Sequence, residues 1–103
     1  MITELNEENF HSYVQNCTKP LLVEFYANWC GYCQQQKAIL EEISKKYENE
    51  YSFAAVNVDH SGNLARLFNA RSIPTLVVFK NGKITNNALG LHSEAQLIDL
   101  FKN

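Results

Sequence analysis

The feature that most limits the folds open to this chain is an apolar run at residues 21–27 (LLVEFYA). Apolar side chains occupy both odd and even positions of this run. Because successive side chains of a strand point to opposite faces of its sheet, such a strand is buried on both faces. The sheet that holds it must be covered on both sides, which predicts an α/β protein with helices on both faces of a single sheet.

Glu24 lies in the middle of this run and is its exception. A buried carboxylate is costly unless it is paired, solvated or protonated. Either Glu24 reaches the surface beside a lysine, or it is a buried proton acceptor close to the residues that follow the same strand. The sequence alone does not decide between these two interpretations.

Two cysteines, Cys30 and Cys33, follow the run directly and open a helix. The loop that a disulfide between them would close is too short to restrict the unfolded chain much, so a purely structural disulfide would add little stability. A helix N-terminus favours the thiolate of the first sulfur through its unpaired N–H groups and its dipole. The spacing therefore favours a reversible dithiol–disulfide pair, in which the second thiol attacks a mixed disulfide. Half of a zinc site and two inert thiols are the alternatives.

Composition narrows the function classes further. The net charge is −2 and the basic residues are scattered, so neither nucleic acid nor a membrane surface is an expected partner. Hydrophobic residues make up 46% of the chain, which suits one packed domain over residues 1–103. We expect neither a membrane span nor a secretory signal, because no apolar run has the length and no signal core follows the first residue. The odd count of three cysteines excludes a full disulfide framework and fits a reducing compartment.

The third cysteine, Cys17, falls on a helical stripe with Phe10, Tyr13 and Val14. We interpret it as a small core residue near the helix end, with a regulatory thiol as the alternative. A zinc site made from the three cysteines and a histidine is a further alternative, although the histidines lack ligand spacing. The histidines are singletons, interpreted as surface or cap residues: His11, His60 and His92.

The first half of the chain contains further helix signals. A weak edge strand at residues 1–5 precedes a helix that starts at Glu7, with Asn6 as its candidate N-cap. The helix after Cys33 runs to about residue 47, and the three glutamines at 34–36 are expected on the exposed side of its first turns. The inner face of this helix consists of Ile39, Leu40, Ile43 and Tyr47.

The second half ends in a hairpin and a helix. A strand at residues 51–58 and a short helix around residues 64–68 come first, and Pro74 then leads into a strand because proline cannot donate to a ladder. Asn81 and Gly82 predict a tight turn into a partner strand at 83–89. Gly90 ends that strand, and Ser93 caps a last helix. The order β-α-β-α-β-α-β-β-α predicts a mixed sheet of about five strands.

Four motifs in this order resemble the thioredoxin family, and the resemblance covers nearly the whole chain. They are residues 23–27 (VEFYA), 29–33 (WCGYC), 73–75 (IPT) and 79–82 (FKNG). A lone pair of cysteines would be weak evidence, whereas these motifs at these separations are specific. The resemblance implies the thioredoxin fold and the activity of a protein dithiol–disulfide oxidoreductase, which needs no metal or organic cofactor.

The resemblance also implies roles for individual residues. Cys30 would be the exposed nucleophile and Cys33 the resolving thiol. Glu24 stands where the family has a buried aspartate and would accept the proton of Cys33. Pro74 would be in the cis form and face the sulfurs, and Gly90 would let a substrate approach. The substrate-binding residues expected from the family are Trp29, Gly31, Tyr32, Ile73, Pro74 and Gly90. The implied partners are protein disulfides and a flavin-dependent thioredoxin reductase, for a cytoplasmic monomer.

Three positions depart from the family pattern. Tyr32 replaces the usual proline, Gln34 replaces a lysine, and Ala55 stands where many members have a lysine near the buried acid. Tyr32 adds a backbone N–H close to Cys30, which proline would lack. The Cys-Gly-Tyr-Cys sequence also resembles a bacterial periplasmic disulfide isomerase, although no part of the dimerisation domain of that protein is seen here. An isomerase or oxidant, and a redox-inert binding module with this fold, are therefore the alternatives.

Overall fold

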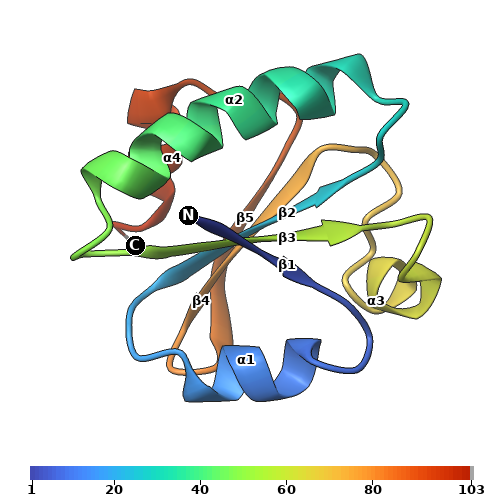
Figure 1. Ribbon diagram of the computed structural model, residues 1–103, viewed down its shortest axis with the longest axis horizontal. Coiled ribbons are helices and arrows are strands. Elements are labelled where there is room, and N and C mark those ends of the chain that lie inside the picture. The colour runs from blue at the N-terminus through green and yellow to red at the C-terminus, as the bar shows by residue number, and fades with distance from the viewer. Residues whose placement is uncertain (103) are drawn as a thin grey trace.

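The computed structural model describes residues 1–102, and its strands and helices follow one another in the order that the sequence predicts (Figure 1). The strands are β1 (Ile2–Leu5), β2 (Leu21–Tyr26), β3 (Ser52–Asn57), β4 (Thr75–Lys80) and β5 (Lys83–Leu89). The helices are α1 (Phe10–Asn16), α2 (Gly31–Lys46), α3 (Gly62–Leu67) and α4 (Glu94–Leu100). No helix within residues 1–102 has the length and apolar character needed to cross a bilayer.

The strands form one mixed sheet with β2 at its centre. Their order in space is β1-β3-β2-β4-β5. β1 and β2 pair in parallel with β3, whereas β4 pairs antiparallel with both β2 and β5. All residues of β2 are buried, and β1 is an edge strand. The predicted mixed sheet, with the apolar run in its interior, is confirmed.

The two faces of β2 pack into two separate apolar clusters. Leu21, Val23 and Phe25 join a cluster that contains side chains of α1 and α3. Leu22, on the other face, joins a cluster formed with α2 and α4. Figure 1 shows α1 and α3 on one side of the sheet and α2 and α4 on the other. Truncating a fully buried ring such as that of Phe25 to alanine costs about 3–5 kcal/mol, so this two-sided burial is a main source of stability.

The turns and caps of the second half follow the local signals. Asn81 and Gly82 have positive φ angles of 53° and 78°, as a two-residue turn between β4 and β5 requires. Ser93 caps α4 in a reciprocal capping box with Gln96. The peptide bond that precedes Pro74 is cis, as the family resemblance implied.

Two expectations about the helices are wrong. α1 begins at Phe10 rather than at Glu7, because the side-chain oxygen of Asn6 accepts hydrogen bonds from the N–H groups of Glu8 and Asn9 and closes a turn there. Gln36 does not lie on the exposed side of α2 but is fully buried, whereas residues 34 and 35 are exposed. The remaining differences concern element ends: β3 spans Ser52–Asn57 rather than residues 51–58, and α2 ends at Lys46 rather than at about residue 47.

Candidate active site

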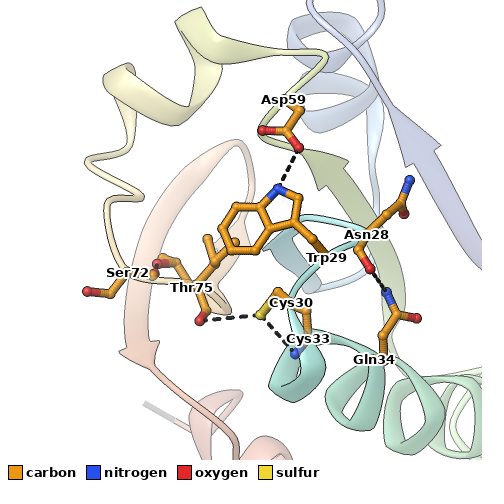
Figure 2. Close-up of a disulfide and its surroundings, with 9 residues drawn as sticks. Asn28, Trp29, Cys30, Cys33, Gln34, Asp59, Ser72 and Thr75 are labelled. Carbon is orange, nitrogen blue, oxygen red and sulfur yellow. Dashed lines mark hydrogen bonds between the residues drawn. A yellow bond between two sulfur atoms is a disulfide. The ribbon is translucent and has the colours of Figure 1, made fainter.

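Cys30 and Cys33 lie at the start of α2 and form a disulfide, with their Cα atoms 5.2 Å apart. Cys30 is the N-cap residue, and its sulfur accepts a hydrogen bond from the backbone N–H of Cys33 at 3.2 Å (Figure 2). Cys30 is 8% exposed and Cys33 only 1%. Cys30 is therefore the more accessible of the two cysteines, although apolar neighbours that include Ile73 cover most of it.

The first turn of α2 favours negative charge on the Cys30 sulfur. The first N–H groups of a helix have no partner within the helix, and the positive end of its dipole lies there. One of these groups, the N–H of Cys33, points at the sulfur, so a thiolate in this place would accept a charge-assisted hydrogen bond. The sequence predicts that the N–H of Tyr32 lies close to this sulfur. The hydrogen bond to the sulfur comes from the N–H of Cys33 instead.

The loop that precedes β4 reaches Cys30 from a distant part of the chain. The carbonyl oxygen of Ile73 lies 3.7 Å from Cys30 Sγ, where it can accept a hydrogen bond from the reduced thiol. The carbonyl oxygen of Pro74 accepts a hydrogen bond from the N–H of Gly90 at 2.8 Å. Ile73, Pro74 and Gly90, which come from two segments, are thus brought together with the cysteine pair.

The two aromatic residues that flank the pair are exposed. Trp29 is 72% exposed and Tyr32 is 65% exposed. Trp29 Nε1–H donates a hydrogen bond to the carboxylate of Asp59 at 2.9 Å, which fixes the indole ring (Figure 2). Asp59 was not among the site residues predicted from the sequence. Its one signal was its position just after β3, because parallel strands β2 and β3 end at the same edge of the sheet. Gly31 opens α2, and a Cβ there would meet nothing within 4 Å.

Glu24 is fully buried in β2, and neither carboxylate oxygen has a hydrogen-bond partner within residues 1–102. The interpretation in which Glu24 reaches the surface is therefore wrong. Burial raises the pKa of this carboxyl to about 8, against the lowering effect of Lys37 and with a smaller raising effect of Glu4. A group with this pKa changes protonation state close to neutral pH, as a general acid or base must.

Helix α2 brings a cation to Glu24. Ala55 lies directly opposite Glu24 on β3 and carries no charge. The ammonium group of Lys37 acts on the Glu24 carboxylate instead, and its Nζ lies 4.7 Å from the centre of the Tyr26 ring. Tyr26 shares a face of β2 with Glu24, and Lys37 follows Cys33 by one turn of α2. The buried acid, its counter-charge and the second thiol therefore all belong to the interface between β2 and α2.

Cys17 lies in a different part of the core. It is the C-cap residue of α1 and packs, half-buried, against the cluster on the opposite side of the sheet. Its thiol donates a hydrogen bond to the carbonyl oxygen of Lys19 at 3.4 Å. Its predicted place near the helix end is confirmed. In the described part of the chain, no group of three or more His, Cys, Asp or Glu residues is arranged to hold a metal ion.

Comparison with known proteins gives one consistent result. The sequence model of a family described as Thioredoxin matches residues 1–103. A thioredoxin of Rickettsia bellii is 34% identical over 103 residues, which is 100% of this chain and 98% of that protein. A thioredoxin of Buchnera aphidicola from Acyrthosiphon pisum is 38% identical over 96 residues, or 93% of this chain and 89% of that protein. The M-type chloroplastic thioredoxin of Zea mays is 36% identical over 96 residues, or 93% of this chain and 58% of that protein.

Proposed function

This chain belongs to the thioredoxin family and is a thiol–disulfide oxidoreductase with Cys30 and Cys33 as its redox pair, and we propose that it reduces protein disulfides. In the proposed cycle Cys30 is the nucleophile, Cys33 is the resolving thiol and Glu24 moves the proton of Cys33. We propose a cytoplasmic, single-domain monomer whose oxidised form is returned to the dithiol by a flavin-dependent thioredoxin reductase. The fit of the whole chain to the family supports this choice.

The reaction consists of two exchanges of sulfur bonds. The Cys30 thiolate attacks one sulfur of the substrate disulfide, and the substrate bond breaks as the mixed disulfide forms. The departing substrate thiolate takes a proton from water. Cys33 then loses its proton, attacks Cys30 Sγ and releases the second substrate thiolate. Two electrons have passed from the protein dithiol to the substrate, and the protein is left as the Cys30–Cys33 disulfide.

The observation that carries the assignment of Cys30 and Cys33 is their position at the start of α2. Cys30 is the more exposed cysteine, and its sulfur accepts the N–H hydrogen bond. Cys33 is buried behind it, so a substrate reaches Cys30 first. A buried thiol is a poor source of thiolate, because burial disfavours its charge. Cys33 therefore benefits from a base close to the same interface.

Glu24 is the base that we propose for this step. Its carboxylate oxygens are buried without a hydrogen-bond partner within residues 1–102, and its pKa of about 8 leaves part of the population as carboxylate at neutral pH. When Cys33 gives up its proton, directly or through a water molecule, Glu24 becomes the neutral acid that its apolar surroundings favour. Burial thereby contributes to the driving force for deprotonating Cys33.

The residues around the sulfurs form the proposed groove for the substrate chain. Ile73 presents its backbone carbonyl group near Cys30, and Gly90, which has no side chain, is hydrogen-bonded to the neighbouring Pro74 on the same border. Trp29, Tyr32 and Gly31 form the opposite, exposed border of the groove. An extended peptide that carries a disulfide would lie between these two borders.

The experiment that tests the proposed function is turnover of insulin disulfides with a small dithiol as the electron donor. A protein disulfide reductase increases the rate of insulin reduction several-fold over that of the donor alone, whereas a redox-inert binding module with this fold does not change that rate.

The direction of the reaction is tested by measuring the reduction potential of the Cys30–Cys33 pair in glutathione buffers. Reference values from other proteins are about −270 mV for thioredoxin and about −180 mV for protein disulfide isomerase. A value near the second would assign the chain to the isomerase alternative.

A further inference from the structure

Gln36 is a fully buried polar residue in the part of α2 that covers the sheet. Its side chain makes two hydrogen bonds with the backbone of one distant residue, His92. Gln36 Nε2–H donates to the carbonyl oxygen of His92 at 3.1 Å, and the N–H of His92 donates to Gln36 Oε1 at 2.8 Å. A pair of bonds in opposite directions fixes both the position and the orientation of the His92 peptide groups.

A second set of bonds carries this anchor to the cis-proline loop. His92 Nδ1 lies 2.7 Å from the carbonyl oxygen of Gly90. A carbonyl oxygen only accepts, so Nδ1 carries the hydrogen. The N–H of Gly90 donates to the carbonyl oxygen of Pro74 at 2.8 Å, and the neighbouring carbonyl oxygen of Ile73 lies 3.7 Å from Cys30 Sγ. This series of contacts begins at Gln36, about one turn after Cys33 on α2, and ends at the sulfur of Cys30.

The energetics indicate that this anchor acts on the segment between β5 and α4. A buried amide that loses its partners costs about 1–3 kcal/mol, so Gln36 disfavours any arrangement in which His92 moves away from α2. Gly90 has a positive φ of 85°, and nothing lies within 4 Å of the place where a Cβ would stand, so side-chain packing does not hold it. Hydrogen bonds to His92 and Pro74 hold Gly90 instead. The exposed Leu91 sits between the two anchored residues.

We propose that Gln36 and His92 are positioning residues for protein substrates: they form a clamp that holds Gly90 against Pro74 and so keeps the substrate groove open beside Cys30. The inference rests on the proposed function, in which Ile73, Pro74 and Gly90 border that groove. A preformed groove lowers the cost of ordering loop and substrate on binding, so the clamp acts on substrates that fill the groove. A small disulfide that contacts only the sulfurs does not need it.

The test compares a large and a small disulfide as substrates. Insulin fills the groove, whereas dithiobis(nitrobenzoate) needs access to Cys30 alone. For Gln36→Leu we expect the ratio of the insulin kcat/KM to the dithiobis(nitrobenzoate) kcat/KM to fall at least fivefold, mainly through the KM for insulin. The matched control is Gln35→Leu, the same change at the neighbouring exposed position of α2, for which the ratio stays within twofold of the wild type.

Two variants of His92 separate the clamp from a general packing defect. His92→Asn keeps an N–H donor close to the place of Nδ1, whereas His92→Phe has none. Both leave the backbone groups that bind Gln36 in place. We expect His92→Phe to lower the same ratio at least threefold and His92→Asn to restore most of it. If Gln36→Leu does not fold, the comparison of His92→Phe with His92→Asn alone tests the clamp.

Amide hydrogen exchange gives the structural result that must accompany the kinetics. In Gln36→Leu the amides of Gly90 and His92 should exchange at least tenfold faster than in Gln35→Leu. A wild-type ratio in both Gln36→Leu and His92→Phe, or protected Gly90 and His92 amides in a folded Gln36→Leu, overturns the clamp. A wild-type protein that turns over neither substrate would overturn the proposed function instead.

Discussion

The N–H of Cys33 donates a hydrogen bond to the sulfur of Cys30 across 3.2 Å, so the first turn of α2 directs a donor at the atom that reacts. This relationship gives the two cysteines unequal chemistry although they are only three positions apart. Cys30 has the donor and the larger exposure, and Cys33 lies behind it in the core. This asymmetry and the buried carboxyl of Glu24 determine how substitutions should change the reaction.

Replacing each cysteine by serine should have opposite effects on the accumulation of the mixed disulfide. Cys30→Ser is expected to abolish turnover, because the accessible sulfur is gone. Cys33→Ser is expected to accumulate a mixed disulfide, because Cys30 attacks but nothing resolves the product. Intact-mass analysis of both variants after incubation with a disulfide substrate checks this. Adducts on Cys30→Ser and none on Cys33→Ser would reverse the two assignments.

Tyr32→Pro should make the redox pair more reducing than it is in the wild type. The N–H of Tyr32 is one of the unpaired donors at the start of α2, and proline would remove it. With one donor fewer, the thiolate of the reduced form is less stable, so the pair gives up its electrons more readily. A loss of about 1.4 kcal/mol in the stability of the reduced form corresponds to about 30 mV for this two-electron couple. The Tyr32 ring is exposed, so we expect its shielding of the Cys30 sulfur from water to be weaker than the effect of the lost N–H. Equilibration of both proteins in one glutathione buffer decides, and an equal or more oxidising Tyr32→Pro contradicts the argument.

Glu24→Gln should slow release of the mixed disulfide more than its formation. The amide keeps the volume of the side chain but cannot accept the Cys33 proton. In the wild type the release rate is expected to rise with pH through about 8, where Glu24 becomes a carboxylate, and this step should vanish in Glu24→Gln. Stopped-flow measurement of the two exchanges from pH 6 to pH 9 separates them. Equal slowing of both would indicate a structural defect.

Lys37→Met should move the same pH step to higher pH. The Lys37 ammonium favours the carboxylate form of Glu24, and methionine keeps most of the side-chain volume without the charge. Glu24 then stays protonated over a wider range, so release at pH 7 is expected to slow several-fold while formation changes little. Lys45→Met, at an exposed position of the same helix, is the matched control and should leave the step where it is.

The stability of the oxidised protein should fall as pH rises from about 5 to about 8. The pKa of Glu24 is raised from 4.5 in its usual state to about 8 in the folded protein, so over this range the folded state holds a proton that the unfolded state has lost. The expected loss in the free energy of unfolding is on the order of 4 kcal/mol. Glu24→Leu should remove this loss, and Glu42→Leu at an exposed position should keep it. Denaturant unfolding at several pH values measures all three, and a flat profile in the wild type would falsify the assignment.

Local patterns determined the scaffold of this protein. The apolar run at residues 21–27, with apolar side chains at both odd and even positions, was enough to predict a strand buried on both faces, because strand periodicity depends on neighbouring residues alone. Asn81 and Gly82 predicted the hairpin through their backbone preferences, and Ser93 predicted the start of α4 in the same way. The spacing of Cys30 and Cys33 between a strand and a helix likewise identified the reactive pair.

Only the tertiary structure decided which polar side chains are buried and what they contact. Glu24 could have been solvated or buried, and the answer depended on α2 closing over β2. Gln36 was expected in solvent because glutamine is polar, yet His92, which lies 56 positions away, supplies the hydrogen bonds that make its burial possible. Asp59 reaches Trp29 for the same reason, since parallel strands bring distant residues to one edge. Periodicity is a property of near neighbours, whereas the burial of a polar group depends on partners that only the folded chain brings together.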